Sequence, residues 1–204
     1  MAALPLETVR RQSLRVAVFI DGNNWYNRMR ELLRGNGMSD DTQQKPPVEF
    51  DLRGLVTELT AGHSLEYIGY FIGKIHQRRG DERSAKLYAG QQKLIRFLTD
   101  HQKIPVMFGD VIMHPDGSYH EKGVDIRLAL DMYKMAVIDV YDIAYLFSSD
   151  NDLRPAVHEC RAIGKEVIYV GSSIRPALGM VECCSRSLLV QPEVLRKYLP
   201  SSPR

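Results

Sequence analysis

Four short apolar runs, separated by longer amphipathic segments, restrict most strongly what this chain can fold into. The runs are RVAVFI ending at Ile20, LEYIGYFI ending at Ile72, IAYLF ending at Phe147 and EVIYV ending at Val170. Their β-branched and aromatic content, with little polar alternation, is typical of strands buried on both faces. Such strands belong to the interior of a sheet covered by helices.

Segments of helical length lie between these runs. They are Glu82 to His101, Asp125 to Met135 and Leu153 to Ile163. Gly164 follows the last of them and suits the end of a helix, because glycine adopts a left-handed conformation easily. Strands that alternate with helices predict βαβ units, so the fold class is α/β with a mainly parallel central sheet.

The length of 204 residues predicts one domain, at residues 15–199, between a tail at 1–14 and a tail at 200–204. Hydrophobic residues make up 44% and charged residues 25%, an ordinary balance for a globular core. A net charge of +2 does not by itself predict nucleic-acid binding. No apolar run approaches the roughly 20 residues that cross a bilayer, so we expect no membrane association and a cytoplasmic protein.

Two segments interrupt the alternation of strands and helices. Residues 35–47 are polar and rich in glycine and proline, which predicts a long loop. Residues 104–120 read as a hairpin with Asp116 and Gly117 at its turn.

Three aspartates stand where a predicted strand ends or a predicted helix begins. Asp21 follows the first run, Asp150 follows IAYLF through two serines, and Asp125 opens a helix. Ligands of open α/β sheets bind at the carboxyl ends of strands, beside the point where the strand order reverses. We therefore expect the three carboxylates to converge there if the first run and IAYLF are neighbours.

Converging carboxylates repel one another unless a cation neutralises them. Hard oxygen ligands select Mg²⁺ or Mn²⁺, which can activate water and stabilise charge on a phosphate. Each aspartate also has a structural interpretation: Asp21 in a turn, Asp150 or Asp152 as a helix N-cap, and Asp125 as a favourable charge at a helix start.

Three motifs, in order, resemble a known family. They are VAVFIDGNNWYN, KGVDIRLALDM and YLFSSDNDLRPAVHECRAIGKEVIYVG, and the likeness runs from about Val16 to Val190. Together they resemble the NYN domain family, including its LabA-like members, which is similar to PIN-domain nucleases. The resemblance implies a PIN-like three-layer α/β/α fold and Mg²⁺- or Mn²⁺-dependent hydrolysis of RNA.

The resemblance also implies roles for individual residues. Asp21, Asp125 and Asp150 match the acidic positions of the three motifs, and Asp152 matches a further metal ligand that acts through water. Lys122 matches a basic residue that contacts the scissile phosphate. The resemblance further allows a homodimer.

Several polar and basic residues are candidates for contact with the substrate. Asn24 matches a polar residue beside the first aspartate, and Ser149 could bond a metal ligand or a phosphate. Lys74, Arg78 and Arg79 belong to a basic loop after the second run, and such residues bind phosphate backbones. A solvated loop with local ion pairs is the other interpretation.

One position departs from the family pattern. Members of the family often carry a further aspartate before the last strand, and the matching position here is near Ser185. The sequence therefore leaves two main hypotheses: a metal-dependent endoribonuclease that cuts single-stranded RNA, and a non-catalytic RNA-binding or regulatory module with a degraded acidic site. A phosphatase of the haloacid-dehalogenase kind is disfavoured, because Asn23 stands where its second aspartate should be.

Overall fold

The computed structural model describes residues 13–34, 46–77, 79–109, 111–113, 119–121 and 123–200. Six strands form the main sheet: β1 (Arg15–Asp21), β2 (Ser64–Ile72), β3 (Val106–Phe108), β6 (Ile143–Phe147), β7 (Glu166–Ser172) and β8 (Arg186–Val190). The α-helices are α1 (Gly22–Arg34), α2 (Leu52–Leu59), α3 (Glu82–Arg96), α4 (Val124–Val137), α5 (Arg154–Ala162), α6 (Leu178–Cys183) and α7 (Pro192–Arg196). A π-helical turn (Phe97–His101) continues α3, and a 3₁₀ turn (Asn151–Leu153) precedes α5.

The strands of the main sheet run in the order β3-β2-β1-β6-β7-β8, and every neighbouring pair is parallel. The predicted α/β class and parallel sheet are therefore confirmed. The chain first builds outward from β1 to β2 and β3, and then crosses to the other side of β1 for β6. The strand order consequently reverses between β1 and β6, the place where ligands of open α/β sheets bind.

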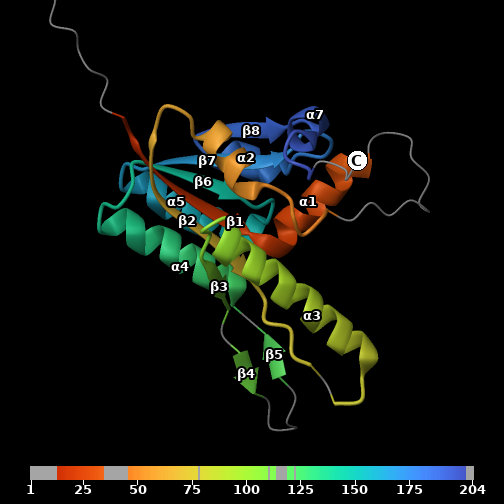
Figure 1. Cartoon of the computed structure of the whole chain (residues 1–204). Coiled ribbons are helices and arrows are strands. Elements are labelled where there is room, and N and C mark those ends of the chain that lie inside the picture. The colour runs from red at the N-terminus through yellow and green to blue at the C-terminus, as the bar shows by residue number, and fades with distance from the viewer. Residues whose placement is uncertain are drawn as a thin grey trace, which may run out of the picture.

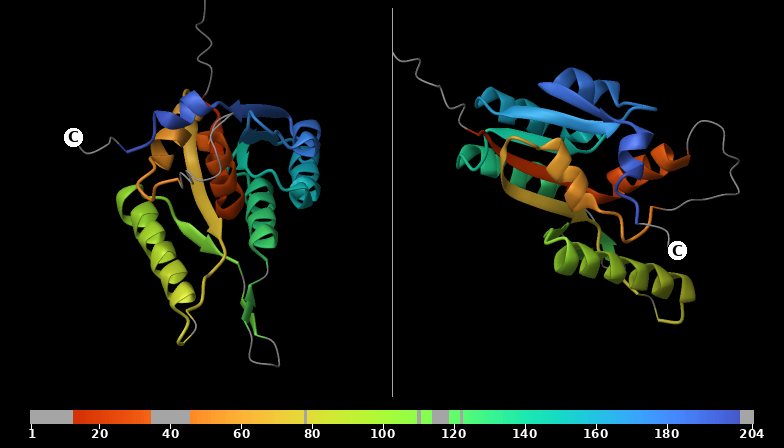
Figure 2. Two further views of the ribbon diagram at one scale, coloured as in Figure 1. Left: turned by 90° about the vertical axis from the view of Figure 1, so that its right-hand side faces the viewer. Right: turned by 45° about the horizontal axis from the view of Figure 1, so that its top comes forward.

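Helices cover both faces of the sheet and make a three-layer domain (Figures 1 and 2). Alternate residues of β1 face opposite cores: Val16 and Ile20 join the core that α1, α2 and α7 cover, whereas Phe19 joins the core that α4, α5 and α6 cover. Because β1 is central, its buried residues contact both layers, which explains its continuous apolar sequence.

The predicted strands and helices lie close to the observed ones, with one correction. Residues 106–108 form β3 of the main sheet instead of the start of a hairpin. An antiparallel pair does follow, β4 (Val111–Met113) with β5 (Tyr119–Glu121), and it projects from the body of the domain (Figures 1 and 2). Its predicted turn at Asp116 and Gly117 lies outside the described residues, as do residues 35–45 of the predicted loop.

Cys160, Cys183 and Cys184 are buried free thiols. Gly164 follows α5 with a φ of 85°, the left-handed conformation expected after a helix. Among the described residues, no helix is long and apolar enough to cross a membrane.

Candidate active site

Asp21, the last residue of β1, has a carboxylate held by two donors. The backbone N–H of Asn24 donates to Oδ1 at 3.1 Å, and the hydroxyl of Ser148 donates to Oδ2 at 2.9 Å. The residue is only 5% exposed, so its orientation is fixed from both sides. Each carboxylate oxygen can accept more than one bond, so both keep capacity for a further ligand.

Helix α1 can begin directly after Asp21 because Gly22 packs without a side chain. A Cβ at this position would stand 2.3 Å from Cγ2 of Ile72 and 2.4 Å from Cε1 of Tyr70. The hydroxyl of Tyr70 also donates to the carbonyl oxygen of Gly22 at 3.2 Å. This close approach lets the first turn of α1 return the Asn24 amide to the carboxylate of Asp21.

Asp150 reaches the same place from the neighbouring strand. In the parallel register Ile20 lies opposite Phe147, so the two chains leave the sheet together. The backbone N–H of Asp150 donates to Oγ of Ser148 at 3.2 Å, and that same hydroxyl donates to Asp21. Ser148 is 1% exposed and therefore joins the two aspartates through one buried hydroxyl.

The structural interpretation of Asp150 as an N-cap also holds, whereas Asp21 ends a strand and adjoins a helix instead of lying in a turn. Oδ1 of Asp150 accepts from the backbone N–H of Asp152 at 2.9 Å and caps the 3₁₀ turn. The bond from Asn24 to Asp21 satisfies an N–H in the first turn of α1 in the same manner. Both carboxylates are thus oriented by the helices that begin beside them.

Asn24 and Ser149, which were predicted to contact the substrate, are built into the scaffold. Oδ1 of Asn24 accepts from the backbone N–H of Ser149 at 3.0 Å. The hydroxyl of Ser149 shares a 2.9 Å hydrogen bond with the hydroxyl of Tyr169. These bonds join α1, the segment after β6 and strand β7 around Asp21.

Asp125 approaches from the first turn of α4, which follows Gly123 in a left-handed conformation. Burial raises the pKa of Asp125, and the charges of Asp150 and Asp152 raise it further. Burial likewise raises the pKa of Asp21; the bonds from Asn24 and Ser148 oppose this, and the charges of Asp125 and Asp150 add to it. The structure therefore brings these four aspartates within electrostatic reach of one another.

The chemistry of this acidic cluster fits a hard divalent cation. The donors are carboxylate oxygens, and their mutual repulsion is the condition that a cation would relieve. As the side chains lie, however, no three acidic, histidine or cysteine groups in the described part of the chain are grouped closely enough to hold one ion together. Binding of one ion by three of these carboxylates would therefore require at least one of them to change its rotamer.

The predicted basic residues are only partly placed. Lys74 and Arg79 are exposed on the segment that leaves the carboxyl end of β2, which is the edge of the sheet where Asp21 lies. Arg78 and Lys122 lie outside the described residues.

Ser185 does not lie near the acidic cluster. Its hydroxyl accepts from the backbone N–H of Val167, and its own N–H donates to the carbonyl oxygen of Val167. Val167 is the second residue of β7, so Ser185 stands at the amino edge of the sheet, roughly 15 Å along the strand from its carboxyl end. The absence of an acid at Ser185 therefore removes no ligand from the cluster.

Asp139 and Asp142 precede β6 and lie at the opposite end of the sheet. Both pair with Arg15, the first residue of β1. Asp139 also pairs with Lys165, just before β7.

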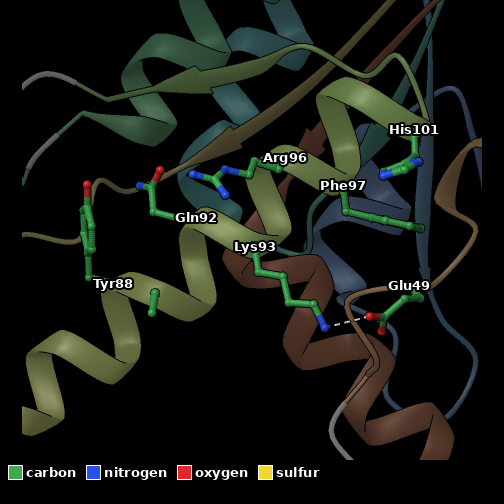
Figure 3. Close-up of a pocket in the computed structure, with 8 residues that line it drawn as sticks. Glu49, Tyr88, Gln92, Lys93, Arg96, Phe97 and His101 are labelled. Atoms are coloured by element: carbon green, nitrogen blue, oxygen red, sulfur yellow. Dashed lines mark hydrogen bonds and ion pairs between the residues drawn. The ribbon is translucent and has the colours of Figure 1, made fainter.

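A cavity lined by described residues lies elsewhere (Figure 3). It measures about 650 Å³ and runs along α3, where Tyr88, Arg96 and Phe97 line it and Lys93 pairs with Glu49. None of the predicted site residues lines it, so this cavity is separate from the acidic cluster.

Ser148 and Tyr169 are the site residues that sequence reasoning missed. The hydroxyl of Tyr169 bonds Ser149 and accepts from the backbone N–H of Ala177 at 3.2 Å. Only the register between β1 and β6 shows that Ser148, and not Ser149, faces Asp21. A sequence signal existed, since Ser148 is the first polar residue after IAYLF just as Asp21 follows the first run.

Comparison with known proteins agrees with this fold. Residues 15–186 match the NYN domain, which covers most of the chain. A crystal structure of a protein of unknown function from Vibrio parahaemolyticus is similar in fold, with a TM-score of 0.58 and 18% sequence identity. The likeness covers 89% of this chain and 95% of that one. No curated protein matches the chain.

Proposed function

The chain belongs to the NYN domain family, and from this membership we propose that it is a metal-dependent endoribonuclease that hydrolyses RNA phosphodiester bonds at the acidic cluster. The observation that carries the proposal is the single buried hydroxyl of Ser148, which bonds both Asp21 and the backbone of Asp150 where the strand order reverses. We also propose that the domain spans residues 15–199, and the packing of Leu195, Tyr198 and Leu199 against the core supports its carboxyl boundary.

Asp21, Asp125 and Asp150 would hold Mg²⁺ or Mn²⁺, with Asp152 contributing through water. Such an ion lowers the pKa of a water and stabilises the charge that develops on a phosphate. Burial is the main cause of the raised pKa values of Asp21 and Asp125, and the charges of neighbouring aspartates add to it. That added repulsion supports the assignment, because a bound cation would relieve it.

The protein's own side chains would orient the reaction. Asn24 and Ser148 fix the plane of the Asp21 carboxylate, so that its remaining lone pairs keep one direction. Lys122 would neutralise the scissile phosphate.

The exposed basic segment after β2 would contact the RNA backbone. Lys74 and Arg79 leave the sheet at the edge where Asp21 lies, and Arg78 stands between them in the sequence. Lysine and arginine bind phosphate without reading the bases, which suits a single-stranded substrate of variable sequence.

The second hypothesis is a non-catalytic RNA-binding module. It is favoured by the capping bonds of Asp21 and Asp150, which give both residues a structural reason to be acidic. The missing family aspartate near Ser185 does not favour a degraded site, because an acid at the position of Ser185 could not reach the cluster.

Cleavage of single-stranded RNA in Mg²⁺ or Mn²⁺ separates the two hypotheses. We expect cleavage by the wild type, loss with EDTA and loss in Asp150→Asn, which keeps an oxygen to cap the 3₁₀ turn. Asp139→Asn is the control, because Asp139 is exposed at the opposite edge of the sheet. Binding of RNA without cleavage by the wild type in either metal would establish the second hypothesis instead.

A further inference from the structure

A second cavity, of about 390 Å³, opens between α1 and the segment after β7. Four arginines, Arg28, Arg30, Arg34 and Arg175, line it around one acid, Glu31. The lining therefore carries three more positive than negative charges, in a chain whose total net charge is only +2. A concentration of arginine of this kind is a candidate site for anions.

Glu31 neutralises only part of this charge. Its carboxylate pairs with NH1 of Arg28 at 2.8 Å and with Nε of Arg175 at 3.6 Å. Within the described ranges, neither Arg30 nor Arg34 has an ion-pair partner. Nε of Arg28 is buried without an acceptor in the same part of the chain. The cavity thus holds guanidinium donors in excess of the acceptors around it.

Helix α1 connects this cavity to the acidic cluster. Asn24 bonds the Ser149 backbone at the start of the helix, and Asn27 and Arg34 line the cavity further along it. Residues at this spacing share one side of a helix, and the opposite side, with Trp25 and Met29, is buried in the core. Ten residues separate Asn24 from Arg34, which is about 15 Å along the axis.

We propose that this arginine cavity binds a phosphate group of the RNA strand, several nucleotides from the bond that is cut. The inference rests on the proposed function, since it assigns the path of that substrate. Arginine binds phosphate through paired N–H groups, which explains why four arginines and no lysine line the cavity. At about 3.4 Å per stacked nucleotide, a strand spans about four phosphates over this distance.

The test measures binding of a labelled 15-nucleotide single-stranded RNA in EDTA, where the proposed cleavage is absent. Fluorescence anisotropy between 50 and 200 mM salt gives the slope of log K against log salt. We expect Arg30→Ala/Arg34→Ala to lower the magnitude of this slope by about 0.7, the amount that loss of contact with one phosphate of a single strand removes. The matched control is Lys103→Ala/Lys134→Ala, which removes two exposed charges near the amino edge of the sheet.

Equal slopes for the two double variants, or no binding of RNA by the wild type, would overturn the inference. If Arg30→Ala/Arg34→Ala lost binding of an acidic peptide but kept the binding of RNA unchanged, the cavity would belong to a protein partner. That result would also overturn the inference.

Cleavage kinetics separate failure of this inference from failure of the proposed function. A dinucleotide cannot span about 15 Å, so Arg30→Ala/Arg34→Ala should raise KM for the 15-nucleotide RNA and leave dinucleotide cleavage unchanged. If the slopes of the two double variants differ but the wild type does not cleave RNA, the nuclease proposal is contradicted and the cavity assignment stands. If the wild type cleaves RNA but the two slopes are equal, the cavity assignment is contradicted and the nuclease proposal stands.

Discussion

Ser148→Ala removes the one hydroxyl that joins the two aspartates. The variant loses a 2.9 Å bond to a buried carboxylate and leaves the Asp150 amide without its 3.2 Å acceptor. A hydrogen bond to a charged group contributes about 1.5–3 kcal/mol, and a neutral one about 1 kcal/mol. We therefore expect Ser148→Ala to lower the free energy of unfolding by about 3 kcal/mol. For a chain of this size the Tm should fall by about 6–12 °C.

A double-mutant cycle with Asp21→Asn isolates the charged bond. In the Asp21→Asn background the hydroxyl of Ser148 meets a neutral amide, so its removal should cost about 1 kcal/mol less. The free energies come from urea unfolding of the metal-free protein, followed by circular dichroism.

Ser172→Ala is the matched control for this cycle. Ser172 is also fully buried, and its Oγ accepts only a neutral bond of 3.2 Å from the backbone N–H of Ile174. Its removal should cost about 1 kcal/mol in both backgrounds. A cost below about 0.5 kcal/mol for Ser148→Ala, or the same cost with and without Asp21, would refute the bridge.

Other predictions concern the scaffold around the cluster. Gly22→Ala places a Cβ 2.4 Å from Tyr70 and should lower the free energy of unfolding by at least about 1–3 kcal/mol. Gly90 lies in α3 with open space around it, so Gly90→Ala should raise the free energy of unfolding by about 0.5–1 kcal/mol. Denaturant unfolding measures both changes, and equal effects would contradict the packing at Gly22. The ion pairs of Asp139 with Lys165 and Arg15 lower its pKa to about 2. Because the folded pKa lies below the unfolded value of about 3.9, the stabilisation is complete above pH 4 and is lost as the pH falls toward 2. Unfolding midpoints from pH 6 to 2 should fall more steeply in the wild type than in Asp139→Asn, and parallel curves would contradict this.

The sequence predicts the parts of this fold whose signal is local. The four buried strands and the helices after Glu82, Asp125 and Leu153 are long and strongly patterned, and the structure contains them. Strand β3 was misassigned because it is three residues long and only partly buried, so it carries little periodicity. Its place in the sheet depends on pairing with β2, which the sequence does not display.

The acidic cluster was predictable as a set of strand ends, because the carboxyl ends of parallel strands meet at one edge. The role of Ser148 was not, because it depends on a register of one residue between β1 and β6. The arginine cavity joins α1 to Arg175, which is remote in sequence, so no single motif marks it. The distance of Ser185 from the cluster likewise became visible only from its bonds to Val167.

The central claim is that Asp21, Asp125 and Asp150 share a divalent cation, and a crystal structure in millimolar Mn²⁺ tests it most directly. Anomalous scattering should place an ion about 2.0–2.3 Å from carboxylate oxygens of Asp21 and Asp150, with one of these side chains turned from the rotamer seen here. The same crystals of Asp21→Asn should show no ion at this position. An empty carboxyl edge in the wild type, with the aspartates still engaged only in their capping bonds, would contradict the account.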